Sequence, residues 1–280
     1  MSGLGSRPGW TPPSLRDPGH GRTPDVVARS SGAVAPAPAL PTDFAETAYD
    51  RKARHLTVVA DPRQRTEELS SWAPRYRGVH RATKRVIDVV SSVLVGILVL
   101  PVLVAAAIAV AVTDGRPVFF AQTRVGRHGR PIKVRKIRTM HVDADAELRA
   151  DPQLFDLYVQ NDFKLDFEED PRVTKLGRTL RKLSIDELPQ LLNVFLGQMS
   201  MVGPRPVVPD ELASYGDLVP AYLVMRPGLT GVWQVSGRND IAYPERAYLD
   251  AAYAREWSLT LDLNIAIRTI PCVLSARGVA

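Results

Sequence analysis

The sequence predicts an α+β protein in which a re-entrant N-terminal membrane helix precedes a compact, mainly helical domain with short strands. Two observations support this prediction. Residues 89–112 form an apolar run of 24 residues without a charge. After it, residues 116–280 show short helical and strand patterns, and several of the helices are one-sided and basic, like amphipathic helices that lie at membrane interfaces.

The composition excludes several classes of protein. The chain has 280 residues, a formal net charge of +6, and Cys272 as its one cysteine. A single cysteine cannot build a disulfide framework or a cysteine-rich metal site. The basic balance points to partners that carry phosphate. Nucleic acid is not among them, because no array of aromatic side chains accompanies the basic residues.

Residues 1–80 read as an extension rather than a domain. They hold ten of the 23 prolines, and residues 1–42 show no helical or strand period. Too little apolar surface is available there to offset the entropy of ordering, so this extension is predicted to be mostly disordered. Within it, Leu56–Ala60 has the pattern of a short strand.

Residues 81–115 are predicted to be membrane-embedded. As a straight helix, the run 89–112 would be roughly 36 Å long, against a hydrocarbon core of about 30 Å. Pro101 kinks such a helix near its middle. Basic residues flank it on both sides, so they give no orientation. A helix that breaks at Pro101 and leaves on the face it entered satisfies both observations, with Lys84 and Arg85 reaching lipid headgroups. A kinked spanning helix and a buried helix of a soluble protein are the alternatives.

Short elements follow in residues 116–280. Strands are predicted at Pro117–Gln122 and Ile132–Ile137, around a turn at Arg127–Arg130. Leu154–Asp170 reads as an acidic, loosely patterned segment. Helices are predicted at Ala144–Arg149, Thr174–Leu183, Leu188–Leu196, Tyr243–Trp257 and Leu261–Leu274, the last broken near Pro271.

The segment Ser184-Ile185-Asp186-Glu187 is the strongest candidate for chemistry. It fits a capping box, in which Ser184 and Glu187 satisfy free backbone amides at a helix start. That interpretation does not explain Asp186. A helix N-terminus stabilises a carboxylate as the anion, and an ionised carboxylate is what an aspartyl-phosphate nucleophile or a Mg²⁺ site requires.

Basic residues around this segment offer contacts to phosphate. Arg205 stands between two prolines, and Arg226 and Arg238 stand in turns beside proline or glycine. Lys136 and Arg138 lie at the end of a predicted strand. Guanidinium groups bind phosphate oxygens in a bidentate way, and lysine adds a further cation, so these five residues are candidate substrate-binding groups.

The motifs also carry a resemblance that covers residues 81–280. In order, they are Lys84-Arg85 with Asp88, Gln122-x-Arg124-Val125-Gly126, Lys136–Met140, Asp170–Thr174, Gly177–Val194, Gly197–Pro206 and Arg226–Asn239. This series resembles the bacterial sugar transferases, the monotopic polyprenyl-phosphate phosphoglycosyl transferases, in their short form. The departures are small: Ile137 and Ile185 replace the usual Phe and Leu, and Leu100 precedes Pro101 where the family commonly has Ser.

The resemblance implies a reaction. Asp186 would attack the phosphate next to the sugar in a UDP-sugar, expel UMP and form a phosphosugar–aspartyl intermediate, which polyprenyl phosphate would then attack. Mg²⁺ would bind near Asp186, while Glu187 would position a group or handle a proton. Lys136 and Arg205 would hold phosphates, and Arg238 would contact the nucleotide. Residues 116–280 would be the catalytic domain.

The same resemblance implies a setting and leaves alternatives. The domain would sit on the cytosolic face of the inner membrane, in contact with membrane lipid, and begin exopolysaccharide or glycoconjugate assembly. Association into a homo-oligomer is left open. A membrane-tethered scaffold without catalysis is one alternative, and the intact Asp186-Glu187 pair argues against it. A metal-dependent hydrolase of lipid-linked diphosphates is the other.

Overall fold

The computed structural model describes residues 69, 71–72, 79–161, 165, 168, 170–237 and 241–274, and all of them belong to one compact unit, Asp43–Ala280. The predictions for residues 1–42 and Leu56–Ala60 lie outside the described residues. Within the predicted extension, Leu69 and Trp72 pack against the hydrophobic core of the domain.

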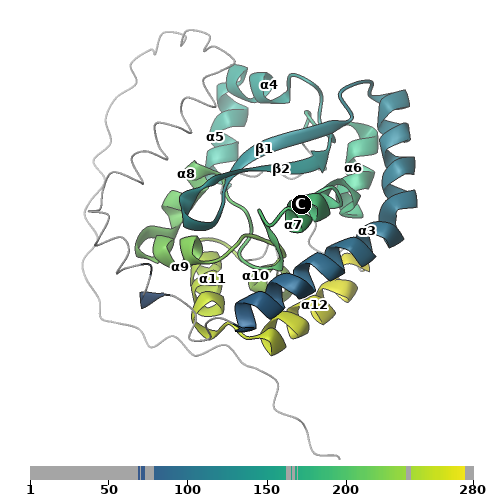
Figure 1. Ribbon diagram of the computed structural model, residues 1–280. Coiled ribbons are helices and arrows are strands. Elements are labelled where there is room, and N and C mark those ends of the chain that lie inside the picture. Colours follow the sequence, from purple (N-terminus) through teal and green to yellow (C-terminus); the bar gives the residue numbers. More distant parts are fainter. Residues whose placement is uncertain are drawn as a thin grey trace, which may run out of the picture. The chain divides into compact units, whose positions relative to one another are not determined.

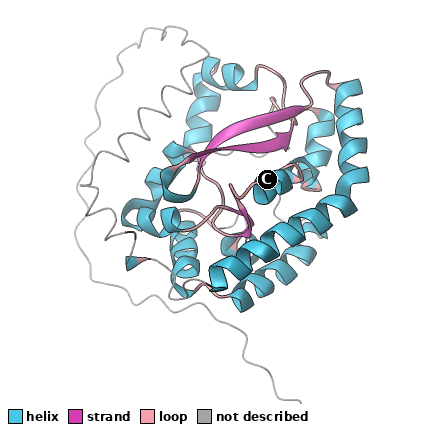
Figure 2. Ribbon diagram, viewed as in Figure 1, coloured by secondary structure: helices cyan, strands magenta, loops and turns pink. Residues whose placement is uncertain are grey.

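Short helices surround two small sheets in this unit (Figures 1 and 2). One sheet pairs β1 with β2 in antiparallel fashion, and the other pairs β3 with β4 in parallel. The strands are β1 (Phe119–Val125), β2 (Pro131–Ile137), β3 (Ser200–Val202) and β4 (Gly228–Thr230). The α-helices are α3 (Val79–Thr113), α4 (Ala144–Ala150), α5 (Pro152–Gln160), α6 (Lys175–Lys182), α7 (Gln190–Phe195), α8 (Pro209–Leu212), α9 (Val219–Val224), α10 (Val232–Ser236), α11 (Glu245–Glu256) and α12 (Leu259–Leu274). Three 3-10 helices complete the set: η1 (Arg127–Gly129), η2 (Ile185–Glu187) and η3 (Ala213–Leu218).

Helix α3 is long and apolar enough to cross a membrane. Only 11% of its most apolar window is buried within the protein, which excludes the buried helix of a soluble core. Figure 1 shows that α3 bends part-way along its length. Pro101 lies inside the helix, and proline is the residue that most often kinks a helix, because it removes a backbone hydrogen bond.

The first turns of α3 are bound to the domain rather than to solvent. Lys84 Nζ lies 2.6 Å from Asp262 Oδ2 on α12, and both Nη atoms of Arg85 donate to carbonyls at the end of α7. Asp88, which is 2% exposed, accepts hydrogen bonds at the start of β3. Both cations attach the helix to the domain, and their predicted contact with lipid headgroups stays a prediction.

The last turns of α3 pack on the same domain. Val110 is fully buried in a cluster with Ile137 of β2 and Leu180 of α6. Just beyond the helix, Asp114 Oδ2 accepts a hydrogen bond of 2.8 Å from the Thr174 hydroxyl. Both ends of α3 are thus attached to one compact unit.

Strands β1 and β2 pair with each other, and helix α7 covers the outer edge of β2. Asn193 of α7 is fully buried and serves that outer edge. Its Nδ2 donates to the Lys133 carbonyl at 2.7 Å, and its Oδ1 accepts from the Arg135 backbone N–H at 3.2 Å. Because a side-chain amide replaces a missing strand here, α7 and the preceding η2 are held in a defined position against β2.

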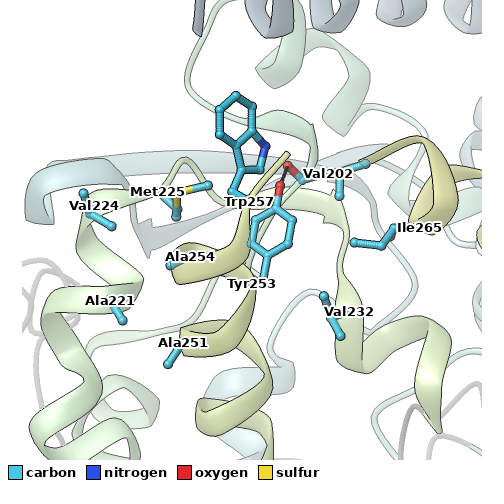
Figure 3. Packing of buried hydrophobic residues seen from close by; sticks show 10 residues of the cluster. All are labelled: Val202, Ala221, Val224, Met225, Val232, Ala251, Tyr253, Ala254, Trp257 and Ile265. Atoms are coloured by element: carbon cyan, nitrogen blue, oxygen red, sulfur yellow. Dashed lines mark hydrogen bonds between the residues drawn. The ribbon is translucent and has the colours of Figure 1, made fainter. Parts of the chain in front are cut away.

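The largest part of the core lies among α9, α10, α11 and α12, below the parallel β3–β4 pair. Figure 3 shows its buried side chains, with the Tyr253 hydroxyl directed at the Val202 carbonyl. The chain approaches itself closely at these strands because Gly203 directly follows β3 and Gly228 begins β4. A Cβ atom added at Gly228 would lie 2.1 Å from the Gly203 nitrogen.

Most predicted elements are confirmed to within two or three residues, with three differences. Helix α5 forms inside the segment expected to be loose, because Asp151 caps its first amides and Pro152 occupies its first turn. Helix α12 continues through Pro271, near its exposed end, where the loss of one hydrogen bond is tolerated. The elements β3, β4, α8, α9 and α10 were not predicted, since three to six residues show no clear period.

Candidate active site

The Ser184–Glu187 segment forms a tight turn rather than a capping box. Ser184 adopts a left-handed conformation with φ of 54°, and its side chain makes no capping hydrogen bond. The 3-10 helix η2 follows, in which successive side chains project about 120° apart. Asp186 is consequently buried, at 5% exposure, whereas the Glu187 side chain keeps 27% exposure. Non-glycine residues with positive φ are costly and gather at functional sites.

Lys136 of β2 joins the two carboxylates. Its Nζ lies 2.7 Å from Glu187 Oε1 and 3.8 Å from Asp186 Oδ2. The alternation of the strand directs Lys136 to the face of the hairpin that meets η2, and the Asn193 contacts keep η2 against that face. A cation from the hairpin and two carboxylates from a remote turn therefore form one cluster.

Burial and nearby charges shift the pKa values of Asp186 and Glu187 in opposite directions. Burial raises the pKa of Asp186 to about 6, against the opposing charges of Lys136 and Arg181. Burial also acts to raise the pKa of Glu187, but Lys136 and Arg205 outweigh it and lower that pKa to about 2. A backbone hydrogen bond at the start of η2 does favour the Asp186 anion, as expected of a helix N-terminus, but burial outweighs it. Above pH 6, Asp186 is a poorly solvated carboxylate, which is suited to nucleophilic attack.

A small open hollow lies beside the cluster. Its charged lining consists of Lys136, Glu187, Arg124 and Arg205. Lys136 and Arg124 reach it together because both lie on one face of the hairpin: Lys136 pairs with Phe120 and Arg124 with Ile132 in the register. The remaining lining comes from Val134, Gln190, Pro206, Gly228, Leu229 and Gln234. Three cations thus meet one carboxylate at its surface, as suits a phosphate-binding site.

Arg205 follows β3 and is held between two prolines, as the sequence predicted. Its guanidinium carbon lies 5.9 Å from the centre of the Trp233 ring. It donates no hydrogen bond to any residue in the described part of the chain. Its donors are therefore available to an anion, and its role in holding phosphate stays a prediction.

Two other predicted substrate-binding arginines lie away from the hollow. Arg138 is buried and donates to the carbonyls of Asp114 and Gly115, at 2.5 and 2.9 Å, so it fixes the end of α3. Arg226 donates to the Gly197 carbonyl at 3.1 Å, just after α7. The prediction for Arg238 lies outside the described residues.

Two cations near the carboxylates were not predicted. Arg181 of α6 is close enough to Asp186 for its charge to lower the Asp186 pKa, and it donates to the Thr139 hydroxyl at 2.9 Å. Arg124 lines the hollow. Arg124 is part of the motif Gln122-x-Arg124, but the sequence alone predicts no role for it because Asp186 and Glu187 are remote along the chain.

Comparison with known proteins decides the family. The family model described as "Bacterial sugar transferase" matches residues 79–276, which include every residue of this cluster and hollow. The chain belongs to the bacterial sugar transferase family. It is therefore an enzyme of the transferase class, and its long apolar helix together with this membership indicates association with a membrane.

Relatives of this sugar transferase are named for exopolysaccharide production or for transfer to undecaprenyl phosphate. The exopolysaccharide production protein ExoY of Rhizobium meliloti is 44% identical over 206 residues, covering 72% of this chain and 90% of the relative. An undecaprenyl-phosphate galactose phosphotransferase of Salmonella typhimurium is 43% identical over 201 residues, covering 71% of this chain and 42% of the relative. A UDP-glucose:undecaprenyl-phosphate glucose-1-phosphate transferase of Caulobacter vibrioides is 42% identical over 200 residues, covering 69% and 70%.

The carboxylates provide an incomplete ligand set for a metal ion. In the described part of the chain, no group of three or more histidine, cysteine or acidic side chains could hold a metal. Mg²⁺, however, is commonly bound by one or two carboxylates with the remaining ligands from substrate phosphates and water. Asp186 beside an anion-binding hollow fits that mode of binding, in which the metal and the diphosphate bind together.

Proposed function

We propose that this sugar transferase moves a sugar 1-phosphate from a UDP-sugar to polyprenyl phosphate, with Asp186 as the nucleophile. The observation that carries the proposal is the buried Asp186 carboxylate, 3.8 Å from Lys136, beside a hollow with three cations. The name of the Caulobacter relative gives the same donor and acceptor classes, and that of the Salmonella relative gives the same acceptor class.

The reaction proceeds in two displacements at one phosphorus atom. An Asp186 oxygen bonds to the phosphorus next to the sugar, the bond to the bridging oxygen breaks, and UMP leaves with that electron pair. A polyprenyl phosphate oxygen then bonds to the same phosphorus and releases Asp186. The product is a polyprenyl-diphosphate sugar, and two steps allow a soluble nucleotide and a lipid to use one site in turn.

The surrounding residues orient and neutralise the phosphates. Lys136 and Arg205 bind phosphate oxygens, and Glu187 keeps Lys136 in place and positions the incoming group. Arg238 contacts the nucleotide. Mg²⁺ held by Asp186 and substrate oxygens would neutralise phosphate charge, which dominates the cost of phosphoryl transfer.

The test uses purified protein, Mg²⁺ and a panel of UDP-sugars, and it measures UMP release. With polyprenyl phosphate we expect turnover, and without it a burst of UMP equal to the enzyme, together with a phosphosugar adduct on the Asp186 peptide in mass spectra. Asp186→Asn should abolish both, while the exposed control Asp217→Asn should retain both. UMP release undiminished in Asp186→Asn would remove Asp186 from this role. Release of free sugar phosphate from a lipid-linked diphosphate would favour the hydrolase.

Helix α3 is proposed to enter and leave the cytosolic face of the inner membrane. Support comes from the attachment of both its ends to one compact unit and from its bend at mid-length. Exposed apolar side chains beside this helix would contact the same membrane surface: Leu192, Phe195 and Leu196 at α7, and Leu263, Ile267 and Ile270 on α12.

Cysteine labelling tests this topology. In a Cys272→Ser background, cysteines replacing His80 and Arg116 should both react with an impermeant reagent from the cytosolic side. Reaction of the two from opposite sides would show that α3 spans the membrane.

A further inference from the structure

Arg124 lines the hollow, and the chemistry described so far gives it no role. Its side chain is 16% exposed. Nε and Nη2 donate to Gln122 Oε1 at 3.1 and 2.6 Å, and Nη1 donates to the Pro206 carbonyl at 3.3 Å. A guanidinium has five N–H donors, so these neutral acceptors hold its plane fixed and leave donors for an anion.

Glu211 forms an ion pair with Arg124 from outside the lining of the hollow. This α8 residue is 5% exposed and does not line the hollow. Its Oε2 lies 3.5 Å from Arg124 Nη1, and its Oε1 accepts a hydrogen bond of 3.1 Å from the Tyr243 hydroxyl. A buried carboxylate requires a charged partner, and here that partner is Arg124.

The cations at the surface of the hollow outnumber the carboxylates there. Lys136 is paired with Glu187 at 2.7 Å, Arg124 has Glu211 at 3.5 Å but outside the lining, and Arg205 has no ion pair in the described part of the chain. Burial lowers the pKa of Arg124, the charge of Glu211 opposes that shift, and the charge of Arg205 adds to it. Bringing like charges together is costly, and a bound diphosphate would relieve the cost.

We propose that Arg124 is a further ligand of the nucleotide diphosphate and that Glu211 is its positioning residue. The proposal rests on the function proposed above, because it assumes that a nucleotide diphosphate occupies the hollow. Arg124 would supply a planar, bidentate contact, while Glu211 would keep the guanidinium aimed at the hollow against repulsion by Arg205.

The first test measures binding of UDP, with Mg²⁺, to the detergent-solubilised full chain by titration calorimetry. Arg124→Lys keeps the charge but loses the planar fork, and we expect about 10-fold weaker binding of UDP. Uridine, which has no phosphate, should bind equally well to both proteins. Arg130→Lys, an exposed position on the same hairpin, is the matched control. Unchanged UDP affinity in Arg124→Lys, or an equal loss for uridine, would overturn the assignment.

The second test separates positioning from direct contact. Glu211→Gln keeps an acceptor for Tyr243 but removes the charge behind Arg124, so UDP binding should weaken by several-fold. If Glu211 acts through Arg124, the double variant should bind UDP no more weakly than Arg124→Lys alone. Additive losses, or unchanged binding in Glu211→Gln, would overturn the positioning role. Failure of the wild type to bind UDP or to release UMP would refute the proposed function itself, whereas a functional wild type with an unaffected Arg124→Lys variant refutes only this inference.

Discussion

Neutralising Asp186 should make the folded protein more stable while abolishing transfer. Burial raises the pKa of Asp186 from 3.8 to about 6. A shift of about two pH units corresponds to about 3 kcal/mol of folding free energy at 1.36 kcal/mol per unit. Since the folded state binds the proton more tightly than the unfolded chain, wild-type stability falls as pH rises from about 4 to about 6 and is lowest above that window. Asp186→Asn avoids this loss.

Glu187 provides a matched variant with the opposite sign. Its pKa is lowered from 4.5 to about 2, so its charge contributes stability above pH 4.5 that is lost as pH falls toward 2. The shift corresponds again to about 3 kcal/mol, which Glu187→Gln removes at neutral pH. Both substitutions are nearly isosteric, and both remove one negative charge beside Lys136.

The assay is thermal unfolding in detergent at pH 4 and pH 8. At pH 8 we expect Asp186→Asn to melt about 5–10 °C above the wild type and Glu187→Gln to melt below it. At pH 4 the advantage of Asp186→Asn should nearly vanish. Shifts of the same sign for both variants at pH 8, or an Asp186→Asn protein less stable than the wild type, would refute the opposite pKa shifts that burial and nearby charge give the pair.

Two further predictions concern pH dependence and packing. The rate of the UMP burst should fall on the acid side with an apparent pKa near 6, because attack requires the Asp186 anion; a rate that is flat from pH 5 to 8 would contradict this. Gly177→Ala should destabilise the fold by about 1–3 kcal/mol or more in chemical unfolding, because its Cβ would lie 2.1 Å from the Thr139 carbonyl oxygen. Gly96→Ala, with no atom within 4 Å of the added Cβ, should leave stability unchanged or raise it slightly, because alanine favours a helix more than glycine does, and equal destabilisation by the two would show that close packing is not the cause.

Local signals predicted much of the fold. An uncharged run of 24 residues indicates a helix in contact with a membrane, and the proline inside the run indicates a kink. Helix α3 could therefore be predicted from the sequence. The β1–β2 hairpin and the helices α4, α6, α7, α11 and α12 carry their periods and ends within a few residues. The motifs also identified Asp186, Lys136 and Arg205 as candidate site residues, because a family is recognised from the order of its motifs along the chain.

The contacts of the charged side chains and the pKa of Asp186 depended on the tertiary structure. Lys84, Arg138 and Arg226 look alike in the sequence as free cations, yet each is used to attach α3 or the end of a helix. The Ser184 turn excludes the expected cap and buries Asp186, which reverses the predicted direction of its pKa shift.

The sequence by itself determined the membrane helix, the order of elements and the family of this protein, since these follow from periodicity, composition and motif order along the chain. Only the tertiary structure decided which charges meet. Lys136, Glu187, Arg124 and Glu211 come from separate strands, turns and helices. The physical reason is that burial and Coulomb interaction depend on distances through space, which packing sets and which local sequence does not encode.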